Sequence, residues 1–460
     1  MNKNEILFEK IALEVKALID SEKIVELNRY LEELHPRDIA EILVDLEEEK
    51  RIKLFEVLPW EIGAKVLDEL DSDIFSSILS KISIEHKKKI LDLMSQDDMV
   101  DILSDLSEDK RQEIINLLDS ELAEDIKELL VYKEDSAGGI MTTDFIALRK
   151  DITVYSAIEY LRENAPDAET IYYVYVIDKD QKLVGVISLR ELIIAKPNSL
   201  IEDIMSEKVI SVNVNDDQEE VAKLVSKYDF LAIPVTDING KLRGIITVDD
   251  IIDVIQEEAT EDIYKFAGTS EAESEHLEED KFFSKVIYSV KARLPWLLIT
   301  LLGGTLSATI LGKYESTISQ YTAVSFFMPL LTGMGGNVGT QSSTLTVRGI
   351  ATGHVDMKRA FKTIFQEMSV GASVGVVCSV IICIVAYLWM GDFKLGVVVG
   401  IAMAANMLTA ATIGTLVPII FKKLGVDPAV ASAPFISTTL DITGLTIYFT
   451  LTTVLLLKIS

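Results

Sequence analysis

Residues 432–449, SAPFISTTLDITGLTIYF, place a single carboxylate, Asp441, near the middle of an apolar run. The surrounding stretch 428–457 contains no other charged residue. A lone ionisable group at that depth in a bilayer costs at least about 2.5–3.5 kcal/mol on insertion scales. Two interpretations account for it: a cation ligand that faces a pore, or a protonated side chain that forms hydrogen bonds. Because no basic residue lies within any apolar run to pair with Asp441, we favour the cation ligand.

Four further apolar runs precede this one, at residues 294–312, 316–347, 368–391 and 395–421. A helix that crosses a bilayer needs about 20 apolar residues, so the sequence predicts a five-helix α transmembrane domain over residues 293–460. Buried core helices would not explain five such runs in succession. An odd number of spans also argues against an inverted repeat within one chain. A pore on the axis of a homodimer is the alternative, since two-fold dimers are the commonest oligomers.

The charges divide the chain into two halves. From Lys285 onward there are six acidic and twelve basic residues, whereas the first 284 residues carry 67 acidic and 32 basic ones. Nine of those twelve bases lie in alternate loops, on one side of the predicted spans. The positive-inside rule therefore predicts a multi-pass plasma-membrane protein with a cytoplasmic N-terminus and an external C-terminus.

Composition excludes several classes of function. A net charge of −29 repels phosphate backbones, so we expect no nucleic-acid partner. The two cysteines, Cys378 and Cys383, lie in an apolar run, and the four histidines show no ligand spacing. No nucleophile elbow or phosphate loop is present, so we do not expect an enzyme. The polar, amphipathic start MNKNEILFEKIALEVKALID predicts no cleaved signal peptide.

A second polar feature lies within the run 316–347. Residues 329–341, PLLTGMGGNVGTQ, combine Gly335 and Gly336 with Asn337 and Gln341. Glycines allow close helix packing, and they also suit a broken or tightly packed helix whose carbonyls and amides line a water-filled path; the two interpretations can both hold. With Ser437, these residues are the predicted pore lining. Two copies of Asp441 beside amides, hydroxyls and carbonyls would form an all-oxygen site suited to Mg²⁺ or Ca²⁺.

Residues 1–132 form an acidic domain of helical repeats. ILVDLEEEKRIKLFEVL at 42 is similar to ILSDLSEDKRQEIINLL at 102, and VLDELDSDIFSSILSKI at 66 is a weaker copy. Such periodicity favours an all-α superhelix.

Residues 133–258 contain a second duplication. VYVIDKDQKLVGVISLREL (174–192) aligns with IPVTDINGKLRGIITVDDI (233–251) at an offset of 59, and each copy predicts a hairpin followed by a helix. The duplication resembles a tandem pair of CBS motifs, an α/β Bateman module, with its halves at about 138–200 and 201–258. Many such modules bind adenine nucleotides, and the matching positions here are Thr247, Asp250 and Phe230. Whether this pair binds ATP or another adenine nucleotide is left open by so short a pattern.

Residues 259–292 change from acidic to amphipathic and basic, which predicts a connecting (plug) helix at the membrane face. Together with the two membrane motifs, the order of segments resembles the MgtE family of magnesium channels and transporters over essentially the whole chain. The resemblance implies that Asp441 is the pore ligand for Mg²⁺ and that Gly335, Gly336, Asn337 and Gln341 lie near the pore. Ala433 stands where some relatives carry a polar residue.

The resemblance also implies feedback by cytosolic Mg²⁺, for which the acidic half supplies carboxylates. We hypothesise that Mg²⁺ bridges the acidic surfaces of the helical and CBS domains and closes the connecting helices over the pore. The candidate regulatory ligands are Asp98, Asp101, Asp105, Asp217, Glu219, Asp229, Asp250, Asp253, Glu258, Glu261 and Asp427.

Three alternatives remain. The first is transport of another divalent cation, such as Co²⁺, Mn²⁺ or Ca²⁺. The second is a membrane-anchored adenine-nucleotide sensor, and the third is a scaffold that binds a partner through its helical repeats. The sensor does not explain Asp441 or the glycine cluster, and the helical repeats have an acidic rather than an apolar surface, which argues against the scaffold.

Overall fold

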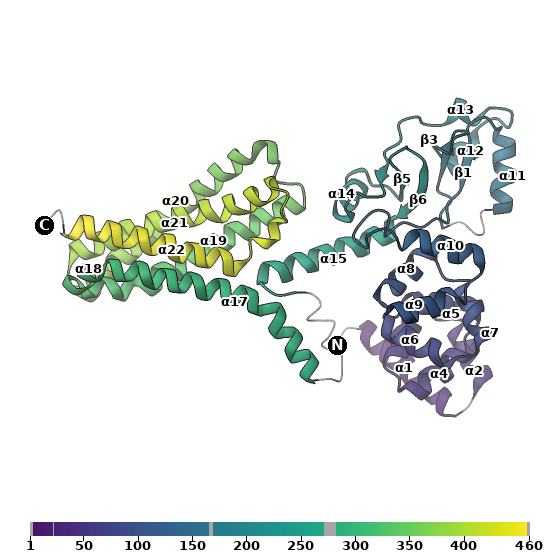
Figure 1. Ribbon diagram of the computed structural model, residues 1–460, viewed down its shortest axis with the longest axis horizontal. Coiled ribbons are helices and arrows are strands. Elements are labelled where there is room, and N and C mark those ends of the chain that lie inside the picture. Colours follow the sequence, from purple (N-terminus) through teal and green to yellow (C-terminus); the bar gives the residue numbers. More distant parts are fainter. Residues whose placement is uncertain (1–2, 22, 165–168, 271–281, 458–460) are drawn as a thin grey trace. The chain divides into compact units, whose positions relative to one another are not determined.

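The computed structural model describes residues 3–21, 23–164, 169–270 and 282–457, and it divides into two compact units, residues 1–255 and 256–460 (Figure 1). The first unit contains short helices followed by two small sheets, and the second contains long apolar helices. Each unit is described by itself below.

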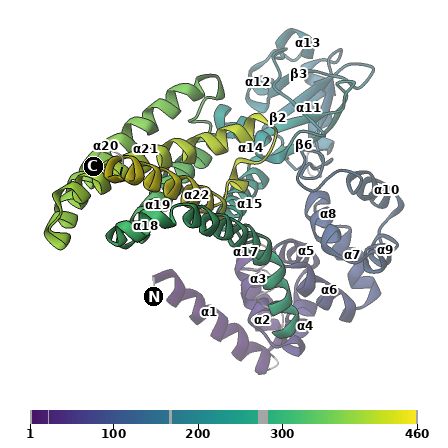
Figure 2. The same ribbon diagram turned by 60° about the vertical axis from the view of Figure 1, so that its left-hand side comes forward.

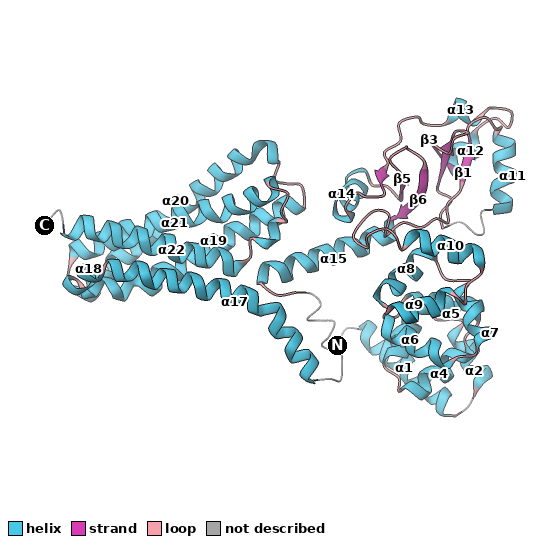
Figure 3. Cartoon of the chain, viewed as in Figure 1, coloured by secondary structure: helices cyan, strands magenta, loops and turns pink. Residues whose placement is uncertain are grey.

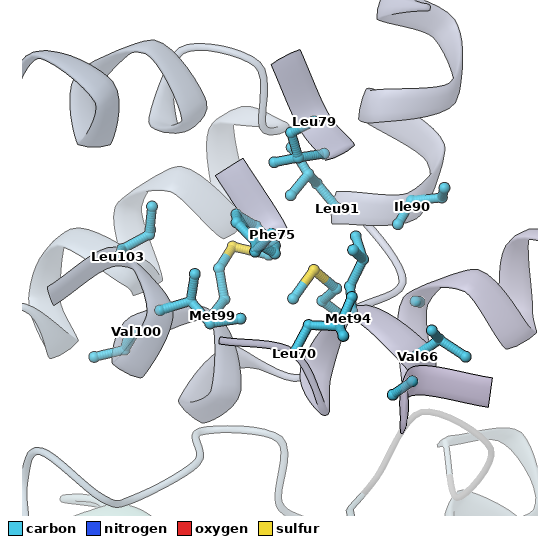
Figure 4. Close-up of a cluster of buried hydrophobic side chains, with 14 of the residues drawn as sticks. Val66, Leu70, Phe75, Leu79, Ile90, Leu91, Met94, Met99, Val100 and Leu103 are labelled. Atoms are coloured by element: carbon cyan, nitrogen blue, oxygen red, sulfur yellow. The ribbon is translucent and has the colours of Figure 1, made fainter. Parts of the chain in front are cut away.

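The first unit begins with a series of short helices, each of about two to three turns after a longer first one. They are α1 (Lys3–Asp20), α2 (Ile24–Leu31), α3 (Pro36–Val44), α4 (Glu48–Val57), α5 (Trp60–Asp68), α6 (Ser72–Lys81), α7 (Ile84–Leu91), α8 (Gln96–Asp105), α9 (Glu108–Ile115) and α10 (Ser120–Leu129). Their apolar residues recur at helical spacing and meet in one core, in which Phe75 is fully buried near Met99 and Met94 (Figure 4). The predicted all-α helical domain is confirmed.

Two arginines show that the sequence repeat is also a structural repeat. Arg51 donates to the main-chain carbonyls of Leu43, Val44 and Leu46. Arg111, 60 residues later, donates to the carbonyls of Leu103, Ser104 and Leu106. Each guanidinium therefore satisfies carbonyls at the end of the preceding helix, which have no partner within that helix.

The sheets come from the duplicated segment, and Figure 3 shows them in magenta. The elements are β1 (Ala147–Arg149), α11 (Val154–Asn164), β2 (Tyr173–Ile177), β3 (Leu183–Ser188), α12 (Leu189–Ile194), α13 (Ile201–Ile204), β4 (Val212–Asn213), α14 (Gln218–Tyr228), β5 (Ala232–Thr236), β6 (Leu242–Thr247) and α15 (Val248–Ala267). In each sheet the first strand pairs in parallel with the second, which pairs antiparallel with the third. This arrangement confirms the predicted tandem CBS pair.

The two CBS halves repeat each other in detail. Asp178 and Asp237 each accept two main-chain N–H groups within the hairpin turn. Gly185 and Gly244 each lie against a methionine side chain that leaves no room for a Cβ atom. The second half shares one continuous hydrophobic core with the helical repeats, whereas the first half has a core of its own.

The second unit consists of the end of α15 and a bundle of long helices. They are α17 (Phe282–Lys313), α18 (Glu315–Gln320), η2 (Thr322–Phe327), α19 (Met328–Ala351), η3 (Met357–Arg359), α20 (Ala360–Met390), α21 (Phe393–Lys423), η4 (Pro428–Val430), α22 (Ala433–Thr452) and the π-helical turn η5 (Thr453–Leu457). Helix α21 packs against α19, α20 and α22, and α17 packs against α22 (Figure 2).

Four helices in the described residues are long and apolar enough to cross a membrane: Val286–Lys313, Met357–Met390, Phe393–Lys423 and Ala433–Leu456. Helix α19 has 24 residues and is long enough, but its glycines and hydroxyl side chains make it less apolar than the other four. The predicted single span 316–347 is wrong in its bounds. The structure divides that run into α18, η2 and α19, and the long helix begins at Met328, just before Pro329.

The prediction of one connecting helix over 259–292 is also wrong. Helix α15 begins as the last CBS helix and runs without a break to Ala267. The next residue, Gly268, has a positive φ of 78°, which ends the helix. Residues 271–281 lie outside the described part of the chain. Helix α17 then begins at Phe282 and runs directly into the first predicted span. The amphipathic pattern was correctly recognised as helical, but it belongs to two helices.

Candidate functional site

Helices α19 and α22 pack closely because glycines remove side chains where they meet. A Cβ atom on Gly336 would lie 3.8 Å from the Cβ of Ser437, and Gly339 leaves space that Leu440 and Ile436 fill. The broken-helix interpretation of the glycine cluster is wrong, because α19 is continuous from Met328 to Ala351. Close packing of an unbroken helix is the correct one.

Polar side chains on these two helices remain on the surface of the single chain. Asn337 and Gln341, one turn apart on α19, are both exposed, and Ser437 and Asp441, one turn apart on α22, are half-buried. Among the described residues, no three Asp, Glu, His or Cys side chains converge on a single point that could hold a metal ion. One chain thus presents a polar strip with one carboxylate, and we name the four residues Asn337, Gln341, Ser437 and Asp441 the polar strip.

A second site lies in the first unit, where the helical repeats meet the CBS pair. Asp68 at the end of α5 lies beside Asp97 and Asp98 at the start of α8, and Asp250 in α15 interacts with Asp97. We name these four residues the acidic cluster. Gln96, which is buried beside them, donates to Asp144 at 2.7 Å and accepts from Thr143, so it ties the helical domain to the CBS segment.

Burial and mutual repulsion make these carboxylates hard to ionise. Burial, and then the charges of Asp98 and Asp97, raise the pKa of Asp68 to about 8. Burial and neighbouring carboxylates raise the pKa of Asp250 to about 7 and that of Asp98 to about 6, although hydrogen bonds from Thr247 and Ser95 oppose the shifts. The Oδ1 atom of Asp68 is buried and has no hydrogen-bond donor among the described residues. The cluster therefore favours a proton or a cation.

The structure brings together few of the other predicted regulatory residues. Asp217 caps the start of α14, while Asp229 ends it with a left-handed φ of 54°, so the two lie at opposite ends of an 11-residue helix. Glu219 forms an ion pair with Lys223 at 2.9 Å. Asp101, Asp105 and Asp253 are exposed, and Asp105 accepts from Ser72. Glu258 is half-buried in the second unit.

Asp427 and Glu261 are joined by a lysine within the second unit. The Nζ atom of Lys265 lies 2.8 Å from Asp427 and 2.6 Å from Glu261. Burial lowers the pKa of Lys265, but the hydrogen bonds to Asp427 and Glu261 outweigh it and raise the pKa overall. Two of the predicted Mg²⁺ ligands, Asp427 and Glu261, are thus paired with a lysine.

The predicted nucleotide residues lie at the end of β6. The Oγ1 and N–H of Thr247 both donate to Asp250, the hydroxyl at 2.6 Å. Phe230 stacks on Tyr228 with ring centres 5.4 Å apart. The equivalent position in the first half is Ser188, which bonds Glu191 in a capping box.

Comparison with known proteins places the chain in a family. The MgtE family, described as divalent cation transporters, matches residues 328–451, its intracellular N domain matches 34–135, and CBS domains match 137–198 and 201–257. The magnesium transporter MgtE of Bacillus subtilis is 37% identical over 446 residues, which cover 97% of each chain. The magnesium transporter MgtE of Thermus thermophilus is 37% identical and covers 97% of this chain and 99% of its own.

This chain belongs to the MgtE family. The crystal structure of the soluble part of a magnesium transporter is 40% identical, with a TM-score of 0.51, and covers 55% of this chain and 99% of its own. The cytosolic domain of an MgtE channel in complex with ATP is 38% identical, with the same TM-score, over 53% of this chain. An inosine-5'-monophosphate dehydrogenase of Halalkalibacterium halodurans matches 26% of this chain.

Membership of the MgtE family confirms the predicted resemblance, and the family and the apolar helices together make the chain a multi-pass membrane protein. Sequence reasoning missed Asp68, Asp97, Gln96 and Lys265, and also Asn406, a buried side chain of α21 that donates to the Leu331 carbonyl. Asp97 and Asp98 are adjacent, so a search for acids on one helix face selected only one of them. The remaining four depend on contacts between segments far apart in the sequence, which no local pattern reveals.

Proposed function

We propose that this protein imports Mg²⁺ through a path between two copies of the chain, lined by α19 and α22. The single observation that carries the proposal is the polar strip. Asn337 and Gln341 are exposed on a helix of the membrane domain, where contact with lipid would be costly. A second copy of the strip across a two-fold axis would enclose water and supply a second Asp441.

The chemistry of the polar strip suits a hydrated magnesium ion. Carboxylate, amide and hydroxyl oxygens are ligands for hard divalent cations, and Mg²⁺ keeps several of its waters when it binds. Two carboxylates on the axis can therefore hold the ion through water, without the converging cluster that direct coordination requires. The named relatives are magnesium transporters, which supports Mg²⁺ over Co²⁺, Mn²⁺ and Ca²⁺ as the substrate.

The test is flux through the purified full chain in liposomes that contain a Mg²⁺-sensitive fluorescent indicator. We expect Mg²⁺ influx that saturates with external Mg²⁺ and that exceeds the influx into protein-free liposomes. Parallel assays with Co²⁺, Mn²⁺ and Ca²⁺ decide between the substrates. Influx no greater than in protein-free liposomes would refute the proposal, and faster entry of another ion would change the substrate.

We further propose that cytosolic Mg²⁺ closes this path by binding the acidic cluster. The proposal is supported by the buried Oδ1 of Asp68, which has no donor among the described residues, and by the neighbouring carboxylates, whose repulsion a cation held through water would reduce. Within the second unit, Lys265 ties α15 to Asp427 at the start of η4, just before α22. Movement of α15 would therefore reach the helix that carries Asp441. The loop charges support a cytoplasmic placement of the acidic half, which this regulation requires.

Mg²⁺ binding to the acidic cluster is expected to release protons near pH 7. The raised pKa values mean that the folded first unit binds protons on Asp68 and Asp250 more tightly than the unfolded chain does, so its stability falls as pH rises from about 4 to 8. Mg²⁺ replaces those protons. We expect proton release on Mg²⁺ addition at pH 7 and much less at pH 9, where the carboxylates are already ionised.

The measurement is the pH change in a weakly buffered solution of the full chain in detergent. Asp68→Asn removes one of the titrating groups and should lower the release at pH 7, whereas Asp73→Asn, an exposed acid of the same domain, should not. Equal release from both variants would show that the protons come from elsewhere.

We also propose that the CBS pair binds an adenine nucleotide at Thr247 and Asp250. The proposal is supported by the partly buried hydrogen bond from Thr247 to Asp250 and by the relative whose cytosolic domain was solved with ATP. Thr247→Val removes the hydroxyl at nearly constant shape, so ATP affinity should fall by about tenfold, the effect of roughly 1.4 kcal/mol. Calorimetry on the full chain measures it, with Ser188→Ala as the matched variant in the first half. If Ser188→Ala alone weakens binding, the site lies in the first half, and if ATP does not bind, this proposal is abandoned.

A further inference from the structure

Asn406 is a buried amide in the middle of α21, away from the polar strip. Its side chain is 1% exposed, and its Nδ2 donates to the main-chain carbonyl of Leu331 on α19 at 2.7 Å. A polar side chain buried in this way inside a membrane domain carries a cost unless it is hydrogen-bonded. Leucine or alanine would fill such a position more cheaply if packing were its only role.

Two glycines on two other helices enclose the amide. A Cβ atom on Gly335 of α19 would lie 2.6 Å from Nδ2 of Asn406, and one on Gly444 of α22 would lie 2.7 Å from its Oδ1. Real Cβ atoms essentially never approach so closely, and here the neighbour is a short, buried side chain held between two helices. The carboxamide therefore fills the space between α19 and α22 with no margin on either side.

The same two helices carry the polar strip, within a turn of the enclosed glycines. Gly335 is two residues before Asn337, and Gly444 is three residues after Asp441, a separation of about 4.5 Å along a helix. If the distance between α19 and α22 changes at Asn406, the distance between the two helices at the polar strip should therefore change by nearly the same amount.

We propose that Asn406 is a positioning residue that sets the distance between α19 and α22, and thereby the width of the ion path beside Asp441. It contacts main chain and glycines, and acts on the ion through the two helices. This inference rests on the proposed function, because the path it adjusts is the one lined by the polar strip. It adds a residue from α21 that determines which hydrated cation passes.

A cycle of four proteins tests the proposal: the wild type, Gly444→Ala, Asn406→Ala and the double variant. In the wild-type background the new methyl meets Oδ1, so Gly444→Ala should lower Mg²⁺ flux by roughly 10- to 100-fold, the usual effect of a displacement of about 1 Å at a functional site. In the Asn406→Ala background the oxygen is gone, so the same methyl should cost little. Asn406→Ala itself should lower the ratio of Mg²⁺ flux to Ca²⁺ flux.

The control is Gly304→Ala on α17, where a Cβ atom would meet no described residue within 4 Å. Flux is normalised to the folded protein recovered by gel filtration, and the Mg²⁺ to Ca²⁺ ratio is independent of that amount. The role of Asn406 would be overturned if the flux losses of Gly444→Ala and Asn406→Ala were additive and the ratio of Mg²⁺ flux to Ca²⁺ flux were unchanged. If flux still required Asp441 in that case, the proposed path would stand. Absence of wild-type flux, or flux indifferent to Asp441→Asn, would instead overturn the proposed path and this inference with it.

Discussion

Asp441→Asn is expected to reduce Mg²⁺ influx in proteoliposomes to the level of protein-free liposomes. The change keeps the size of the side chain and removes the one charge in α22, which is half-buried beside Ser437 on the polar strip. On a two-fold axis the variant loses both carboxylates at once. The two carboxylates supply the negative charge that holds the hydrated ion, so neutral amides should not replace them. Because the variant also removes a costly charge from the bilayer, the protein should fold at least as well as the wild type.

The matched control is Asp356→Asn, the same chemical change at an exposed position that caps η3. Asparagine also caps helices, so both folding and flux should be retained. Comparable flux in Asp441→Asn and the wild type would remove the pore proposal. It would favour the membrane-anchored nucleotide sensor, in which the apolar helices serve only as an anchor.

Neutralising the acidic cluster is expected to abolish the response to Mg²⁺ on the cytoplasmic side. The triple variant Asp97→Asn, Asp98→Asn and Asp250→Asn removes three carboxyl groups whose pKa values are raised mainly by burial, with a contribution from neighbouring carboxylates. Neutral amides can be buried side by side without charge repulsion, as protonated carboxyl groups can, so the variant should keep the compact arrangement of the first unit. The first unit should therefore resist protease at all Mg²⁺ concentrations, and flux should stay low even when internal Mg²⁺ is absent. In the wild type, we expect protection from protease to increase as the Mg²⁺ concentration rises. In variants that lack only one of the three carboxylates, the Mg²⁺ concentration needed for this protection should change by roughly tenfold or more.

Limited proteolysis and flux are measured on the same preparations. A control triple variant, Asp73→Asn, Asp109→Asn and Asp180→Asn, removes equal charge at exposed positions of the same unit. This control should keep the wild-type response of flux and protease protection to Mg²⁺. The comparison therefore separates an effect of the acidic cluster from an effect of the net charge of the unit. If the control loses the response as well, regulation depends on total charge, and if neither does, the cluster is not the sensor.

Much of the fold could be predicted because the deciding signals are local. The apolar runs gave the membrane helices, and the two duplications gave the helical and CBS repeats, down to the equivalence of Asp178 with Asp237. Boundaries were less accurate, as with 316–347 and 259–292. Hydropathy does not show where a helix begins or ends. Pro329 lies in the first turn of α19 and Gly268 follows the last residue of α15, and their dihedral angles favour these two boundaries.

The candidate site, like the fold, has features that the sequence shows and features that it does not. Asp441 and the glycine cluster were visible in the sequence because a charge or a run of glycines inside an apolar segment is costly or unusual wherever it lies. The partners of each carboxylate were not visible. Lys265, which the sequence analysis did not single out, pairs with Asp427 162 residues away. Asp68 joins the acidic cluster through the packing of α5 against neighbouring helices, which sequence periodicity alone does not specify.

The sequence by itself determined which residues must be in the membrane, how the chain is divided and which family it belongs to, because hydrophobic burial and repeats are properties of short stretches. Only the tertiary structure decided which carboxylates repel one another, which are neutralised by a lysine, and that Asn406 lies between Gly335 and Gly444. Those relations depend on distances of a few ångströms between helices remote in sequence. Electrostatic and packing energies change steeply over such distances, whereas local sequence patterns do not record them.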